Sequence, residues 1–147
     1  MEPSERSGYS LLECLIVLSC TTILVILTVP NLNLLQQEWT LWGCTRSVES
    51  SLRWGRAQAI SSNTSILFEV TGNGSRYCWI DAESGYKYEN SAFRLPDVVR
   101  IISHPARPLR FYPHGNAVPA GTYVIRAKTG SYSVVVNPGG RIRVERN

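Results

Sequence analysis

The most apolar part of the chain is a continuous run near the N-terminus, residues 11–30, which reads LLECLIVLSCTTILVILTVP. In an α-helix, about 20 residues span roughly 30 Å, the thickness of the hydrocarbon core of a bilayer. The preceding segment, 1–8, is short, and no A-x-A cleavage site typical of a signal peptide follows the run. The pattern predicts a retained transmembrane helix.

After Pro30 the pattern becomes amphipathic. Apolar side chains recur at spacings near three or four residues, or sums of these, as on one face of a helix. They are Leu32, Leu35, Trp39, Trp42, Val48, Leu52, Ala59 and Ile60. The helix is predicted to continue to about Ser62, with the stripe of its second half packed on a sheet.

Short strand patterns separated by glycine-rich turns follow the helix. The predicted strands are Ile66–Thr71, Tyr77–Asp81, Val98–Ile102, Leu109–Tyr112, Thr122–Ala127, Tyr132–Asn137 and Arg141–Glu145. One long helix followed by an antiparallel sheet is an α+β fold.

Composition and charge refine this picture. The chain has 147 residues, 44% hydrophobic and 18% charged, which is enough for one domain with its own core. The net charge is +4, but the part from Arg94 onward carries nine basic and two acidic residues, which gives +7. Such a basic region indicates either a polyanionic partner or a solvated face that keeps the domain soluble.

The chemistry-bearing residues do not predict an enzyme. There is no nucleophile elbow, no phosphate-binding glycine loop and no Cys or His spacing typical of a metal site. No catalytic residue, metal or cofactor is therefore expected. Cys14 and Cys20 lie in the apolar run, whereas Cys44 and Cys78 could form one disulfide in an oxidising compartment.

Glu13 interrupts the apolar run with a charge. A carboxylate is costly in lipid, so it either reaches the headgroup level or has a specific partner. Cleavage between Gly8 and Tyr9 would create an α-amine four residues before Glu13, and the two charges could neutralise each other within one chain or between neighbours.

Residues 8–13, GYSLLE, resemble the type IV prepilin motif. The resemblance implies cleavage after Gly8 by a membrane prepilin peptidase and N-methylation of Tyr9, which stands where phenylalanine is usual. It also implies that Glu13 neutralises the N-terminus of an adjacent subunit during filament assembly. Pro30 falls where pilin helices commonly contain a proline, at a bend or a locally melted turn.

Four later segments resemble the FimT/GspH group of minor pseudopilins: 52–60 (LRWGRAQAI), 111–115, the hairpin 122–137 and the ending 139–144. The resemblance implies a pilin-like fold, a single pass through the bacterial inner membrane, a periplasmic domain, and other pilins or pseudopilins as partners. The expected divisions are leader 1–8, transmembrane helix half 9–30, amphipathic half 31–62 and β-rich domain 63–147.

The C-terminal arginines are the candidate DNA-binding residues. Arg141 and Arg143 alternate, so in a strand they share a face, and paired guanidiniums suit phosphate. The same spacing relates Arg126 and Lys128, and Arg146 could extend the set. In FimT-like proteins of natural transformation, a Gly-Arg-x-Arg ending is associated with DNA binding. The matching segment here is 140–143, which begins with Gly140.

Two functions therefore remain open at this point. The first is a minor pilin or pseudopilin of a type IV pilus system that binds incoming DNA. The second is a structural pseudopilin of a type II secretion system in which these arginines are only solvated charges on an edge strand.

Overall fold

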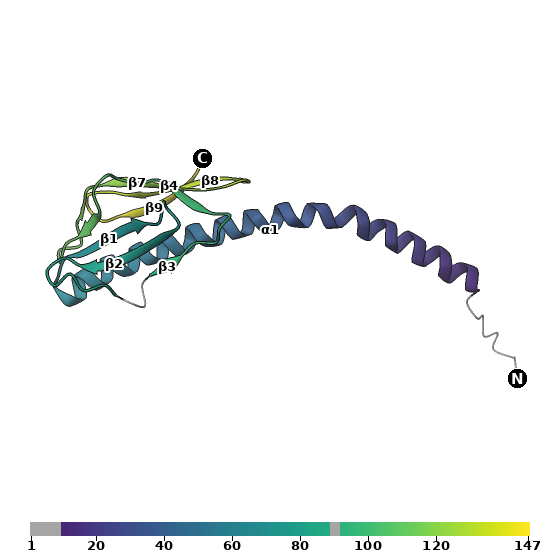
Figure 1. The fold of residues 1–147 in the computed structure, drawn as a ribbon, viewed down its shortest axis with the longest axis horizontal. Helices are drawn as coiled ribbons and strands as arrows, with labels where there is room; N and C mark the ends of the chain where they lie inside the picture. Colours follow the sequence, from purple (N-terminus) through teal and green to yellow (C-terminus); the bar gives the residue numbers. More distant parts are fainter. Residues whose placement is uncertain (1–9, 89–91) are drawn as a thin grey trace, which may run out of the picture. The chain divides into compact units, whose positions relative to one another are not determined.

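The computed structural model describes residues 10–88 and 92–147, and within the helix it leaves the side chains of 27–32 undescribed. Gly8, Tyr9 and the side chain of Pro30 therefore lie outside the described part, and their predicted roles stay predictions. The chain divides into two compact units, 1–35 and 36–147. One helix, α1 (Leu11–Ser62), contributes to both, as Figure 1 shows.

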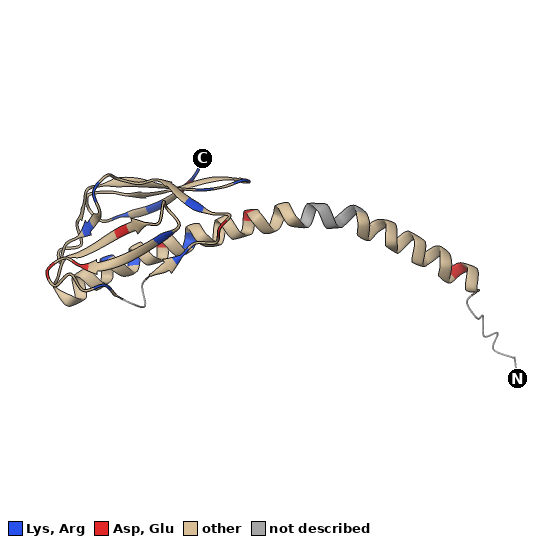
Figure 2. Cartoon of the chain, in the orientation of Figure 1, with Lys and Arg blue, Asp and Glu red and all other residues tan. Residues whose placement is uncertain are grey.

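In the first unit, the described side chains of α1 up to residue 26 are exposed and mostly apolar. The hydroxyl groups of the serine and threonine side chains among them donate to carbonyls of the preceding turn, as from Ser19 to Leu15 at 2.8 Å and from Thr22 to Leu18 at 2.7 Å. These hydroxyl groups therefore have hydrogen-bond partners within the helix. Glu13 is the only charged residue between 11 and 35 (Figure 2). Within the described residues, we find no helix long and apolar enough to span a membrane.

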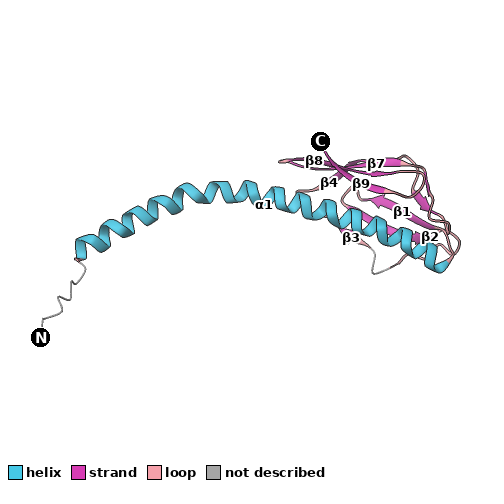
Figure 3. Ribbon diagram, turned by 180° about the vertical axis from the view of Figure 1, so that it is seen from behind, coloured by secondary structure: helices cyan, strands magenta, loops and turns pink. Residues whose placement is uncertain are grey.

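The second unit contains two antiparallel sheets (Figure 3). The five-stranded sheet has the order β3-β2-β1-β5-β6 and the four-stranded sheet the order β4-β7-β8-β9. The strands are β1 (Ile66–Thr71), β2 (Arg76–Asp81), β3 (Phe93–Arg94), β4 (Arg100–Ser103), β5 (Leu109–Phe111), β6 (Ala117–Val118), β7 (Gly121–Ala127), β8 (Gly130–Val136) and β9 (Ile142–Arg146).

The predicted α+β class, the end of the helix at Ser62 and all seven predicted strands are confirmed, with ends that shift by at most two residues. The expectation of a single sheet was wrong. The partners of β2 and β5 at the ends of the five-stranded sheet, β3 and β6, have two residues each, which is too short to show an alternating pattern.

Aromatic side chains form the centre of the core between α1 and the sheets. Trp79 is fully buried and its Nε1 donates to the Ser51 hydroxyl of α1 at 2.9 Å. Its ring lies 4.8 Å from that of Phe68, which in turn packs edge-on against Tyr123 of the other sheet at 5.4 Å. Trp79 comes so close to the helix that a Cβ built on Gly55 would lie 2.2 Å from its ring. A glycine is therefore required where the helix crosses β2.

The possible disulfide between Cys44 and Cys78 is not formed in this structure, where both thiols are free. Cys78 alternates along β2 with Tyr77 and Trp79, which are buried on the side of α1, so it points to the opposite face of the sheet. There its Sγ lies 4.0 Å from a carboxylate oxygen of Glu69. Cys44 belongs to the helix, and burial raises the pKa of both thiols.

Candidate functional site

A groove of about 480 Å³ lies between the end of α1 and the start of β9. We call it the basic groove, because four of its lining residues are arginines and none is acidic. It is lined by Arg53, Arg56, Ala57, Ile60, Gly139, Gly140, Arg141, Ile142 and Arg143. Arginines from two distant parts of the chain therefore meet at one surface.

Arg56 fixes the wall of the basic groove. Its Nε donates to the carbonyl oxygen of Gly115 at 3.0 Å, and its Nη2 donates to that of Gly139 at 3.3 Å. These carbonyls belong to the turn before β6 and the turn before β9, 59 and 83 residues away in sequence. One half-buried guanidinium thus joins both turns to the helix.

Gly140 is required by the close packing of these two turns. Its φ of +73° lies in the left-handed region, and a Cβ there would come within 2.1 Å of the Gly115 carbonyl oxygen. The turn is closed by its own hydrogen bonds, from Gly140 N to the Asn137 carbonyl at 2.8 Å and from Asn137 N to the Arg141 carbonyl at 3.0 Å. The glycine before the first arginine therefore sets the direction in which β9 leaves the turn.

Arg141 and Arg143 flank the buried Ile142 and are both exposed at the mouth of the groove. Arg143 pairs in register with Val135 of β8, and β9 is an edge strand of its sheet. The guanidiniums of Arg141 and Arg143 thus line the same groove as the two arginines of α1.

The other predicted DNA-binding residues, Arg126, Lys128 and Arg146, do not line the basic groove. Arg126 lies opposite Arg100 of β4, and Lys128 lies in the turn between β7 and β8. Arg146 is an odd number of residues from Arg143 and so faces the other side of β9. There its Nη2 contacts Glu38 Oε1 of α1 at 3.0 Å.

Arg53 and Arg56 line the groove but were not predicted as members of the site. Together with Ala57 and Ile60 they have the spacing i, i+3, i+4, i+7 that places residues on one helix face. The sequence shows this helix face, but it does not show which turns of the β-rich domain contact it.

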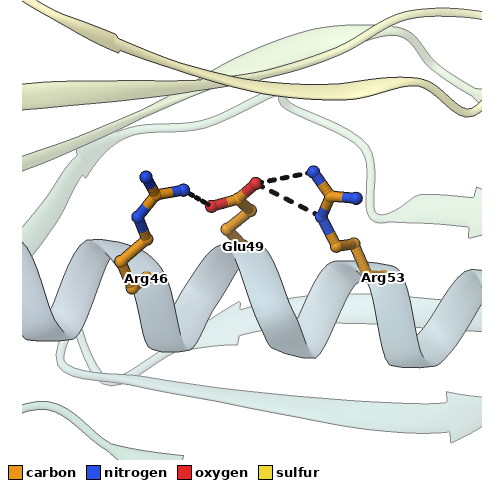
Figure 4. A network of polar contacts seen from close by, with 3 residues as sticks. All are labelled: Arg46, Glu49 and Arg53. Carbon is orange, nitrogen blue, oxygen red and sulfur yellow. Dashed lines mark hydrogen bonds and ion pairs between the residues drawn. The ribbon is translucent and has the colours of Figure 1, made fainter.

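A carboxylate lies directly beside the groove without lining it. Glu49 Oε1 accepts hydrogen bonds from Nε and Nη2 of Arg53 at 3.2 and 2.8 Å, and its Oε2 accepts one from Arg46 Nη1 at 2.5 Å (Figure 4). Burial would raise the pKa of Glu49, but the hydrogen bonds and charges of both arginines together hold it below its ordinary value. Glu49 therefore stays ionised and neutralises part of the charge at the groove.

The described residues contain no cluster of three or more His, Cys, Asp or Glu side chains that could hold a metal ion. The lining of the groove itself supplies guanidinium groups, which bind anions.

Comparison with known proteins identifies the family. Residues 45–140 match the family described as Type II transport protein GspH. The match covers well over half of the chain, from the second half of α1 to Gly140. This chain belongs to the GspH family. It is a minor pseudopilin of the GspH/FimT type, as its motifs predicted.

Solved structures of minor pilins share the fold of this GspH-family protein. The minor pseudopilin EpsH from the type 2 secretion system of Vibrio cholerae matches with a TM-score of 0.57 and 18% identity, over 69% of this chain and 92% of EpsH. The type IV minor pilin FimU of Pseudomonas aeruginosa matches with a TM-score of 0.60 and 18% identity, over 71% of this chain and 91% of FimU. No protein with a curated description matches the sequence.

Proposed function

We propose that this minor pseudopilin is a membrane-anchored subunit of a type IV pilus-like filament that binds DNA through the basic groove. The observation that carries the proposal is the convergence of four arginines on one groove without a carboxylate in its lining. Guanidinium groups suit phosphate because their N–H donors form a planar fork. Such contacts to the DNA backbone are largely independent of sequence.

Binding to two unrelated DNA duplexes tests this proposal. The full chain in a non-ionic detergent should bind both with similar affinity, in the micromolar range at 50 mM salt, and more weakly as salt rises. Fluorescence anisotropy of labelled duplexes measures this directly. If neither duplex is bound at 50 mM salt, the groove has no role in DNA binding.

A structural subunit of a type II secretion pseudopilus is the second candidate function. The family description and the fold shared with EpsH favour it. In that case Arg141 and Arg143 are solvated edge-strand charges that prevent strand addition. Absence of DNA binding together with copurification of secretion pseudopilins would support this candidate.

The proposed anchoring and processing depend on the N-terminal segment. We expect the prepilin peptidase to remove residues 1–8, because a cleavage site directly before a helix leaves room for little more than a hydrogen atom at Gly8. The intact mass of the wild-type membrane protein should lack this segment and include a methyl group on Tyr9, whereas Gly8→Leu should retain the leader. An intact leader on the wild-type chain would contradict this expectation.

Glu13 is proposed to pair with the N-terminal amine of a neighbouring subunit. It lies in the first turn of α1, and its position in the apolar run makes an unpaired charge there costly. Glu13→Val should still insert into the membrane but should reduce copurification with partner pilins by about tenfold, because the amine would lose its counter-charge.

Thr21→Val is the matched control for Glu13→Val, because it also makes the same helix more apolar but removes no charge. It should copurify with partners as the wild type does. Equal recovery of partners with both variants would show that Glu13 has no role in pairing.

A further inference from the structure

We propose that Glu49 is an internal counter-ion of the basic groove, which holds Arg53 at the groove wall and limits the affinity of the groove for phosphodiesters. This inference rests on the proposed DNA binding and adds a residue of α1 that determines its strength.

Arg53 and Glu49 differ in their exposure and in their position relative to the groove. The Arg53 side chain is 63% exposed and lines the groove, whereas the Glu49 side chain is only 9% exposed and does not. Arg53 uses Nε and Nη2 to contact one carboxylate oxygen. Its Nη1 makes no hydrogen bond with another described residue and can donate to a phosphate while the ion pair persists.

Glu49 itself cannot swing away, since its second oxygen is bonded to Arg46. The Arg46 guanidinium lies 4.3 Å from the centre of the Trp42 ring, and Trp42 packs on Tyr132 of β8 at 5.5 Å. The carboxylate is therefore held between two arginines on the helix (Figure 4), and a bound phosphate must share Arg53 with it.

A negative charge in this position repels a phosphate bound at Arg53. The interaction between charges several ångströms apart is strong enough to matter at a half-buried site and is screened by salt. Removal of the charge should therefore strengthen binding, although it also breaks two ion pairs that stabilise the helix. Binding affinity and folding stability should thus change in opposite directions.

Glu49→Gln tests this in the full chain, with a labelled duplex and anisotropy at 100 mM salt. The glutamine keeps a hydrogen-bond acceptor of the same length. The Kd should fall about three- to tenfold. Glu83→Gln, which removes one negative charge from an exposed turn after β2, is the matched control and should change the Kd by less than about twofold.

A double-mutant cycle shows whether the gain acts through Arg53. In the Arg53→Gln background, Glu49→Gln should no longer strengthen binding. The role of Glu49 would be overturned if Glu49→Gln raised the affinity for DNA equally in that background. It would also be overturned if the wild type bound DNA and Glu49→Gln did not raise its affinity. Absence of DNA binding by all these proteins would instead overturn the proposed function, and this inference with it.

Circular dichroism would reveal whether Glu49→Gln fails to fold. In that case a second comparison, which does not use this variant, still tests the role of Glu49. Because Nε and Nη2 of Arg53 already donate to Glu49, Arg53 has fewer donors for a phosphate, and Arg53→Gln should weaken binding less than Arg141→Gln does. An equal or larger loss with Arg53→Gln would show that Glu49 does not limit the contribution of Arg53.

Discussion

Replacing Gly55 by alanine is expected to lower the free energy of unfolding by about 2–3 kcal/mol. In a helix interior this change normally stabilises, by about 0.5–1 kcal/mol. Here the added Cβ would lie 2.2 Å from the ring of Trp79. That ring is fully buried, and its Nε1 is bonded to Ser51, so it cannot withdraw without loss of packing and of the hydrogen bond. Denaturant unfolding followed by circular dichroism measures the difference.

Gly43→Ala is the matched control, because it is the same substitution in the same helix. Gly43 is exposed and a Cβ built there meets nothing within 4 Å. This variant should gain about 0.5–1 kcal/mol. If both variants are stabilised, the close contact between α1 and β2 is not as the structure places it.

The double change Arg141→Gln, Arg143→Gln has the largest expected effect on function. Each phosphate contact adds about 0.9 to the magnitude of the slope of log K against log salt on duplex DNA. The loss of two contacts should therefore flatten the slope by about two and weaken binding about 50-fold at 100 mM salt. Both side chains are exposed, one directly before the edge strand β9 and one within it, so folding should be preserved, and circular dichroism checks this.

Arg126→Gln with Lys128→Gln removes the same charge from a place outside the groove. These two residues were predicted to belong to the site, because they share the alternating spacing of Arg141 and Arg143. The structure places them at the other end of the sheet's central hairpin. This control should retain the wild-type slope within about half a unit and weaken binding only slightly, through long-range attraction.

Elements with a clear period could be predicted from the sequence. The helix ends at Ser62 as expected, because the apolar stripe stops there and Asn63 takes a positive φ of 54°. The strands that pack against the core have alternating apolar and polar residues, and the sequence predicted them. Division into two sheets could not be predicted, because it depends on long-range pairing such as that of β1 with β5 and of β4 with β7.

The candidate site could be predicted only in part. Spacing placed Arg141 and Arg143 together, because alternation within one strand is local. The contribution of Arg56 depends on its hydrogen bonds to the Gly115 and Gly139 carbonyls, which lie 59 and 83 residues away. Such distant contacts leave no trace in local periodicity. Cys78 forms no disulfide with Cys44, because it lies on the face of β2 that points away from α1. Its neighbours Tyr77 and Trp79 are buried on the opposite face.

The most direct test of the DNA-binding groove is the slope of log Kd against log salt for three proteins: the wild type, the Arg141→Gln, Arg143→Gln variant and the Arg126→Gln, Lys128→Gln variant. If DNA binds in the basic groove, the first variant should lose about two units of slope and the second almost none. Equal slopes for all three proteins, or equal losses in both variants, would show that DNA binding, if present, follows overall charge and not the basic groove.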